Sequence, residues 1–225
     1  VEGKTLRRII EERGLLPENE ALEIAKQIAK GLEHALAKKI LHRDVKPENV
    51  IVTPQGLAKL LDMGLACVAG AQEEGEAAES DVKKRMAAGT PHYIAPEAAR
   101  GEDIDTRADL YSLGCTLYQM LAGTTPYQGN NGRAIMALHV AEAFPDIREK
   151  RPKLSEHAVR ILEKLTAKDR EKRYANPEQA IEDLDAVLRG AAPKHAAPPA
   201  EGKSAKVKAG STTGPRAPIG ERGTT

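Results

Sequence analysis

The sequence predicts a mainly α-helical domain that carries one small β-hairpin, an α+β chain overall. Apolar residues recur every three or four positions over residues 17–39 and again after Asp105, which is the spacing of helices. Between these stretches, the apolar residues 50–52 and 57–61 flank a turn that contains proline and glycine, which is the pattern of a hairpin. With 225 residues, the chain is long enough for one sizeable domain and a tail.

Charge and composition argue against nucleic acid as a partner, a membrane span and secretion. The formal net charge is +1, so no overall electrostatic attraction to nucleic acid or to a membrane surface is predicted. No apolar run approaches the ~20 residues that a membrane span requires, and no signal-peptide pattern opens the chain. Cys67 and Cys115 are far apart in a chain without secretory features, so both are predicted to be free thiols of a cytoplasmic protein.

Local signals predict where several helices begin and end. Pro17 suits the first turn of the long helix. Ser155 and Asn176 are typical capping residues and are predicted to start the last two helices, the second of which ends near Gly190. Shorter helices are also expected over residues 6–10 and 133–143.

The helix that begins at Asp105 and runs to about residue 121 is predicted to be buried on all sides. Gly123 ends it. Asp109 lies within this helix, and an unpaired buried carboxylate is costly, so its oxygens must accept hydrogen bonds. The apolar residues that surround the helix are Leu110, Tyr111, Leu113, Cys115, Leu117, Tyr118, Met120 and Leu121.

The stretch HRDVKPEN, residues 42–49, carries the strongest chemical signal. Phosphoryl transfer needs a positioned hydroxyl, positioned metal ions and charge compensation more than covalent help from the protein. Asp44 can orient the hydroxyl or accept its proton, and Lys46 can reach the transferring phosphate. Asn49 can offer a neutral oxygen to Mg2+. Asp62 is a second candidate ligand, which the predicted hairpin would place at the strand end next to Asn49.

Five motifs in this order resemble those of protein kinases. HRDVKPEN resembles the catalytic loop of eukaryotic-type (Hanks-type) kinases, and Asp62-Met63-Gly64 resembles their DFG metal-binding motif. GTPHYIAPE, residues 89–97, resembles the end of their activation segment. Asp109 resembles the aspartate that holds the catalytic loop, and Arg173 resembles the arginine that pairs with the glutamate of APE, here Glu97. The resemblance covers residues 1–189 and is closest to bacterial Ser/Thr kinases.

This resemblance implies the large C-terminal lobe of a protein-kinase-like fold, with ATP and Mg2+ as cofactors and a Ser or Thr hydroxyl of a protein as acceptor. Thr90 would bridge Asp44 and Lys46, a feature that separates Ser/Thr kinases from tyrosine kinases. The backbone amides of His42 and Arg43 would donate to Asp109. The nucleotide and its metal would contact Val1, Leu6, Lys46, Asn49, Ile51 and Asp62, with Val1 at the adenine edge and Leu6 and Ile51 beneath the ring.

Residues 62–97 would form the activation segment. Arg43 marks a kinase type whose segment a phosphate can order through a charge-assisted pair, and Ser80 is the one hydroxyl before Thr90. The alternative is that the acidic residues around Ser80 form a solvated face with no modification. Met63 replaces the usual phenylalanine of DFG and can fill the same apolar slot.

The Gly-rich loop of the family, its ATP-binding lysine and the glutamate that pairs with this lysine would precede Val1. None of them occurs in the chain, and neither does a Walker sequence. The sequence therefore predicts a C-terminal lobe that starts at the hinge, whose partner is the missing N-terminal lobe of the same protein. Alone, such a lobe is expected to bind ATP poorly and to turn over little.

Two other functions are compatible with parts of this pattern. A non-catalytic, pseudokinase-like scaffold or interaction domain usually lacks Asp44, Asn49 or Asp62, and all three are present. A small-molecule kinase of related fold shares the aspartate and asparagine of the loop but lacks the APE segment and the Lys46–Thr90 pairing. An Asp44→Asn substitution would separate the catalyst from the scaffold.

Two parts are predicted along the chain. Residues 1–190 form the kinase C-terminal lobe. Residues 191–225 are rich in alanine, proline, glycine and basic residues and are predicted to form a flexible tail.

Overall fold

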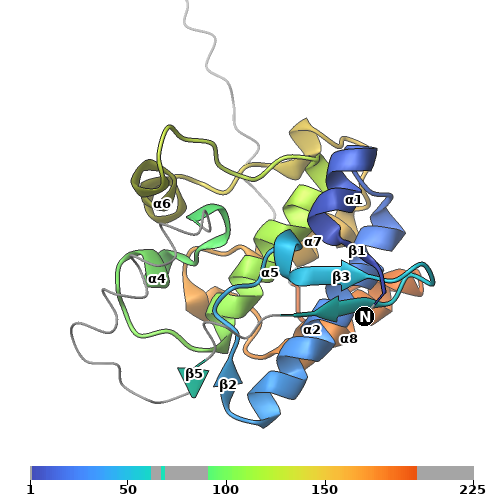
Figure 1. The fold of residues 1–225 in the computed structure, drawn as a ribbon, viewed down its shortest axis with the longest axis horizontal. Helices are drawn as coiled ribbons and strands as arrows, with labels where there is room; N and C mark the ends of the chain where they lie inside the picture. Colours follow the sequence, from blue (N-terminus) through green and yellow to red (C-terminus); the bar gives the residue numbers. More distant parts are fainter. Residues whose placement is uncertain (1, 62–66, 69–90, 197–225) are drawn as a thin grey trace, which may run out of the picture.

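The structure is a computed structural model that describes residues 2–61, 67–68 and 91–196. It has the predicted class, a mainly α-helical fold with small antiparallel sheets (Figure 1). The α-helices are α1 (Leu6–Arg13), α2 (Glu18–Ala37), α4 (Pro96–Ala99), α5 (Thr106–Ala122), α6 (Gly132–Ala141), α7 (Glu156–Leu165) and α8 (Pro177–Leu188). The strands are β1 (Lys4–Thr5), β2 (Ile40–Leu41), β3 (Val50–Val52), β4 (Ala58–Leu60) and β5 (Cys67–Val68). Short 3-10 turns are η1 (Pro47–Asn49), η2 (Pro91–Tyr93), η3 (Ile147–Glu149) and η4 (Arg170–Lys172).

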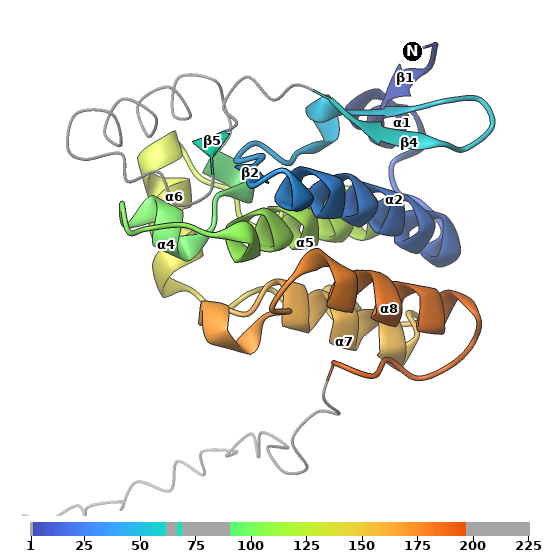
Figure 2. The same ribbon diagram turned by 90° about the horizontal axis from the view of Figure 1, so that it is seen from below.

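Helix α5 runs through the middle of the fold. It packs against α2 and α7, and α2 in turn packs against α8. Figure 2 shows α2 and α5 as a central layer, with the strands on one side and α7 and α8 on the other. Leu110, Leu113 and Leu117 are fully buried, as are most side chains of the helix. This burial confirms the prediction made from its apolar residues. The polar side chains Asp109, Ser112, Thr116 and Gln119 of α5 are buried as well, and each has a hydrogen-bond partner.

The predicted hairpin is present. Strands β3 and β4 pair antiparallel with Val50 opposite Leu60, and β1 adds a third strand, with Lys4 opposite Val52. A second antiparallel pair, β2 with β5, was not predicted. A strand of two residues shows no alternation of apolar and polar side chains, so sequence patterns cannot reveal it.

Most helix ends follow their predicted capping residues. Asp105, Ser155 and Asn176 each accept a hydrogen bond from a backbone amide in the first turn of their helices. Gly123 ends α5 with a φ of 75°, and a Cβ there would lie 2.5 Å from the carbonyl oxygen of Gly14. The glycine is therefore required both for its backbone conformation and for this close approach.

Helices α1, α2 and α6 differ from their predicted bounds. Helix α1 continues to Arg13, whereas residues 6–10 were predicted. Helix α2 begins at Glu18, so Pro17 is the N-cap residue and lies one position before the first turn. Helix α6 spans Gly132–Ala141, whereas residues 133–143 were predicted. The side chain of Asn131 explains the earlier start, since it accepts a hydrogen bond from the amide of Ala134.

The beginning of the predicted tail is part of the folded unit. Pro193 and Ala196 are buried, and the amides of residues 194–196 donate to Asp183 of α8. The packed region thus extends six residues past the predicted boundary at residue 190. The bonds come from backbone amides, so the composition of the stretch gave no sign of them.

Two further findings concern the predicted environment. Within the described ranges, no helix combines the length and the apolar character needed to cross a bilayer. Cys115 is a buried free thiol, and burial raises its pKa well above the ordinary value. The side chain of Cys67 lies outside the described part of the structure.

Candidate catalytic site

The loop that holds the candidate site is fixed to α5 by Asp109. The backbone amide of His42 donates to one oxygen of this carboxylate at 2.9 Å, and the amide of Arg43 donates to the other at 2.8 Å. Asp109 is 4% exposed. Two amide donors stabilise a carboxylate that would otherwise be costly to bury, and the same bonds set the position of the loop. This arrangement is the one expected from the sequence.

Three of the predicted residues meet at one carboxylate. Lys46 Nζ lies 2.7 Å from Asp44 Oδ2, and Asn49 Nδ2 donates to the same oxygen at 2.8 Å. Asn49 Nδ2 also donates to the backbone carbonyl of Asp44 at 2.9 Å. Because the loop turns back through η1, residues separated by two and five positions point at a common centre.

The second oxygen of Asp44 differs from the first. Oδ1 is buried and has no hydrogen-bond partner among the described residues. Asp44, Tyr93 and Ser112 are among the residues that line a cavity of about 20 Å³, enough space for one water-sized group. Asp44 therefore presents an acceptor atom whose capacity is unused by the described part of the chain.

The hairpin links Asn49 to the chain just before Asp62. The amide of Leu61 donates to the carbonyl of Asn49 at 2.7 Å, and His42 Nε2 lies 3.1 Å from the carbonyl of Leu61. A carbonyl can only accept, so Nε2 carries the proton and Nδ1 accepts from the amide of Asp44 at 3.4 Å. The residue before Asp62 is thus held beside the Asp44 cluster.

The remaining predicted nucleotide contacts are only partly described. Leu6 is fully buried at the start of α1, and Ile51 pairs with Thr5 in the sheet. Arg43 has a φ of 65°, a left-handed conformation that is uncommon for a residue with a side chain. Predicted site residues that lie outside the described residues are Val1, Asp62, Met63, Ser80 and Thr90.

The predicted pair of Glu97 and Arg173 is present and buried. The guanidinium donates to both oxygens of Glu97, at 2.6 and 2.8 Å, and each residue is 3% exposed. Arg173 also donates to the carbonyls of Ala167, Arg107 and Lys168. Residues 91–97 enter α4 at this point, so the pair fixes the chain next to the candidate site.

Sequence reasoning missed an ion pair that joins this loop to α1. Arg7 Nη1 lies 2.9 Å from Glu48 of the loop, and Arg7 Nε lies 2.6 Å from Glu11. The hydrogen bond to Glu11 is the largest of the effects that raise the pKa of Arg7. Glu48 could have been singled out because it lies within the HRDVKPEN motif, but Arg7 carries no signal of its own.

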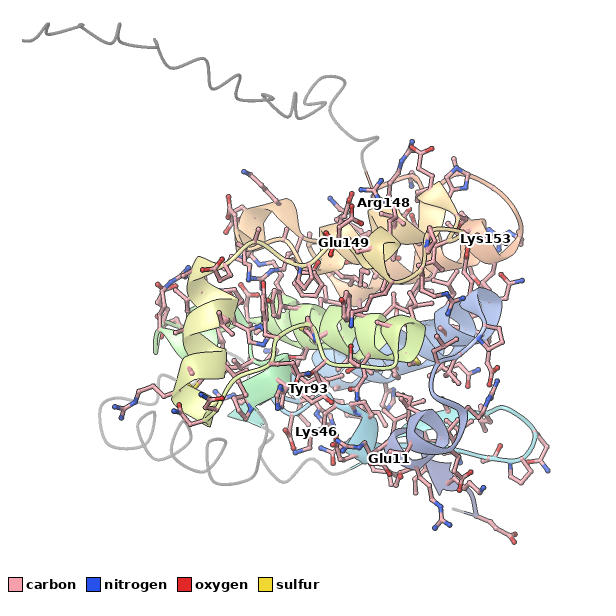
Figure 3. All side chains as sticks on the ribbon, turned by 90° about the horizontal axis from the view of Figure 1, so that it is seen from above. Glu11, Lys46, Tyr93, Arg148, Glu149 and Lys153 are labelled. Atoms are coloured by element: carbon pink, nitrogen blue, oxygen red, sulfur yellow. The ribbon has the colours of Figure 1, made fainter. Side chains whose placement is uncertain are left out.

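Tyr93 lies on the same side of the molecule as Asp44 and Lys46. Figure 3 shows Lys46, Tyr93 and Glu11 together, on the opposite side from Arg148 and Lys153. The hydroxyl of Tyr93 donates to Gln119 at 2.5 Å, and burial raises the pKa of Tyr93.

The sequence of the chain is similar to those of known proteins. Residues 1–184 match the family model described as protein kinase domain. A probable serine/threonine-protein kinase PknB of Bifidobacterium longum is 35% identical over 197 residues, which cover 88% of this chain and 28% of that protein. The probable serine/threonine-protein kinase CPE1738 of Clostridium perfringens is 35% identical over 84% of this chain and 27% of its own length. For the serine/threonine-protein kinase PknB of Mycobacterium leprae, the identity is 33%, over 86% of this chain and 30% of that protein.

The chain therefore spans less than a third of the length of these relatives. Its match to the family model covers most of its own residues, and the matched stretch contains the Asp44 cluster and its support from Asp109. This chain belongs to the protein kinase domain family, and the relatives named above are bacterial proteins named as serine/threonine-protein kinases.

Proposed function

We propose that this chain forms the acceptor-binding part of a kinase that transfers the γ-phosphoryl group of ATP to Ser or Thr hydroxyls of proteins. The observation that carries the proposal is the geometry of Asp44, whose Oδ2 holds Lys46 and Asn49 while Oδ1 has no partner among the described residues. A carboxylate held by one oxygen and open at the other suits an incoming hydroxyl.

The reaction would use these residues as follows. Asp44 Oδ1 accepts a hydrogen bond from the acceptor hydroxyl and takes its proton as the oxygen attacks the γ-phosphorus. The bond between that phosphorus and the oxygen it shares with ADP breaks, and ADP leaves. Lys46, held 2.7 Å from Asp44, places an ammonium where negative charge gathers on the transferring group.

The donor atoms present fit Mg2+. Asn49 uses its Nδ2 for both bonds to Asp44, which leaves its amide oxygen as a neutral ligand of the hard type that Mg2+ prefers. Asp62 follows Leu61, whose amide is bonded to the carbonyl of Asn49. We propose that Asn49 and Asp62 hold the ion, and bound Mg2+ would neutralise charge on the ATP phosphates.

Further parts of the proposal concern specificity, partner and location. Thr90 and Lys46 would select Ser or Thr acceptors, and phosphate on Ser80 would order the activation segment through Arg43. The N-terminal lobe that completes an ATP site would be the partner of this chain, with Val1, Leu6 and Ile51 at the adenine ring. The reaction would take place in the cytoplasm, where ATP is available and a free thiol such as that of Cys115 stays reduced.

A fusion protein tests the proposal. The N-terminal lobe of the Bifidobacterium longum relative, placed ahead of residue 1, should give a protein that moves radiolabelled phosphate from ATP to Ser and Thr peptides. Matched Tyr peptides should accept none, and the unfused chain should transfer little. A folded fusion that binds ATP but transfers no phosphate would overturn the proposal.

Two substitutions in the fusion complete the experiment. Asp44→Asn removes the carboxylate that orients the hydroxyl, so transfer should fall by about 10²- to 10⁴-fold. The matched control is Asp103→Asn, which makes the same chemical change at an exposed residue and should leave transfer unchanged. Equal rates for both variants would favour a scaffold over a catalyst.

A further inference from the structure

The chain reverses direction after α8 and runs back along it. Gly190 has a φ of 78°, a conformation that glycine adopts without strain. The amide of Ala191 donates to the carbonyl of Ala186 at 2.8 Å, which closes the turn. Figure 2 shows the segment after α8 curling back beneath α7 and α8. Residues 193–196, called the C-terminal latch below, thereby return to the level of Asp183.

Asp183 holds this latch through its backbone. Its carboxylate is fully buried and accepts hydrogen bonds from three consecutive amides: Lys194 at 2.6 Å, His195 at 2.9 and 3.1 Å, and Ala196 at 2.8 Å. Bonds between a carboxylate and amides are stronger than neutral ones. The latch is therefore held by a charge in the core of the fold.

The side chains of the latch add to this attachment. Pro193 and Ala196 are buried, and Ala196 is 3% exposed. Glu182, next to Asp183, pairs with His195 Nε2 at 2.7 Å and with Lys194 Nζ at 3.2 Å. These two pairs are more exposed than Asp183, so they contribute less than the buried amide bonds.

The fifth bond to Asp183 connects the latch to the Glu97–Arg173 pair. The hydroxyl of Tyr174 donates to Asp183 Oδ2 at 2.9 Å, and Tyr174 is fully buried. Tyr174 directly follows Arg173, which holds Glu97 of α4. If the latch left α8, Tyr174 would be the one remaining described donor to Asp183, and a buried carboxylate with one donor is unstable. Asp183 and Tyr174 would then have to move.

We propose that residues 193–196 form a regulatory latch, held by Asp183, whose opening loosens α4 through Tyr174 and Arg173. Because α4 follows the chain that runs beside the candidate site, the position of the chain beyond residue 196 would be transmitted to the acceptor side. A partner that pulls on or binds residues after the latch would thus alter the site without touching it.

Hydrogen exchange of the whole 225-residue chain tests the latch with no need for phosphate transfer, so its result is independent of the proposed function. In Asp183→Asn, an NH2 group replaces one acceptor oxygen and opposes the amide donors. Exchange of the amides of residues 194–196 should become about tenfold faster. Exchange of the amides of residues 99–102, which donate to carbonyls of residues 95–98, should rise by about threefold.

Two further variants guard against misfolding. Ala196→Arg opens the latch from its own side, since its buried site cannot hold a guanidinium, and it should give the same exchange pattern. Lys194→Ala is the matched control: it removes an exposed side chain but keeps the backbone amide, so exchange should stay within about twofold of the parent.

The outcomes separate the parts of the proposal. Unchanged exchange at residues 194–196 in both opening variants would overturn the latch. Faster exchange there with unchanged exchange at residues 99–102 would overturn the link to α4. In Tyr174→Phe, which cuts the link, Asp183→Asn should no longer change exchange at residues 99–102; a full additional effect would exclude the route through Tyr174.

Discussion

Buried carboxylates have different numbers of hydrogen-bond partners in the loop of residues 42–49 and in the helices α4 to α8, called the helical base or the base below. In the base, both oxygens of Glu97 accept from Arg173, and both oxygens of Asp183 accept from backbone amides. In the loop, one oxygen of Asp44 binds Lys46 and Asn49, whereas the other has no partner in the described ranges. Both oxygens of these carboxylates thus have partners in the base, whereas in the loop only one oxygen of Asp44 has a described partner.

From this difference we expect the base to determine mainly the free energy of unfolding and the loop to determine mainly activity. A fully bonded buried charge resists replacement because its partner would be left uncompensated. An acceptor atom without a partner adds nothing to folding stability, and its hydrogen-bonding capacity is left for the proposed substrate hydroxyl. Substitutions in the base should therefore lower the free energy of unfolding, and substitutions in the loop should lower activity. The four predictions below test this division.

Asp44→Asn should have the largest effect, and the effect should be on activity. In the fusion with an N-terminal lobe, phosphate transfer should fall by about 10²- to 10⁴-fold. The free energy of unfolding, measured in urea, should fall by less than about 2 kcal/mol because one oxygen is already without a described partner. If the free energy of unfolding fell by more than the activation free energy of transfer rose, Asp44 would act mainly on stability, contrary to this prediction.

Glu97→Gln should have its effect on stability. It leaves the Arg173 guanidinium buried without its counter-ion, so the free energy of unfolding should fall by about 3–5 kcal/mol in urea. The double variant Glu97→Leu with Arg173→Met removes both charges and should be more stable than Glu97→Gln alone. A double variant that is equally unstable would show that the lost bonds from Arg173 to the three backbone carbonyls outweigh the unpaired charge.

The buried imidazole of His139 should make the free energy of unfolding of the chain depend on pH. Burial, followed by the nearby Lys168 ammonium, lowers the pKa of His139 to about 3. The folded state therefore keeps the imidazole neutral, whereas the unfolded chain takes up a proton below pH 6.5. Stability is fully present above pH 6.5 and falls as the pH drops toward 3, by about 2 kcal/mol between pH 7 and 5.

The measurement compares urea unfolding at pH 7 and pH 5 for the parent chain and for His139→Gln. The variant has no imidazole to titrate, so its loss of stability between these pH values should be smaller by about 2 kcal/mol. Parallel losses in the two proteins would mean that His139 is protonated in the folded state.

Arg7→Gln should have the smallest effect. Arg7 bridges Glu11 and Glu48, but the side chain is 46% exposed. Exposed pairs are screened by water and salt, so the free energy of unfolding should change by less than about 1 kcal/mol. The difference should shrink further in 1 M salt, as thermal unfolding at two salt concentrations can show. A loss above about 2 kcal/mol would show that these exposed pairs contribute as much to stability as the buried charges of the base.

The sequence predicted the parts of the site in which chemistry restricts the residue type. The need of Asp109 for donors followed from its predicted burial, whereas the identity of the donors, the amides of His42 and Arg43, followed from the resemblance to protein kinases. The hairpin beside Asn49 follows from its apolar strands and its turn. The fold class follows from helical periodicity, which α2 shows clearly, since its buried residues recur at three and four positions.

Other features could not be predicted, for identifiable physical reasons. The pairing of β2 with β5 and the attachment of residues 194–196 depend on backbone amides and carbonyls, which every residue has. The contact between Arg7 and Glu48 joins two exposed charges that could each have found several partners. The roles assigned to Val1, Asp62, Met63, Ser80 and Thr90 remain predictions.

The hydrogen bonds that Asp109 accepts from the amides of His42 and Arg43 have a consequence for thermal unfolding. Two hydrogen bonds attach the loop of residues 42–49 to the first turn of the deeply buried helix α5, so the position of the loop depends on the interior of the fold. Heating should therefore abolish function and melt the interior in one cooperative event, with no intermediate in which the globule survives and only the loop is disarranged.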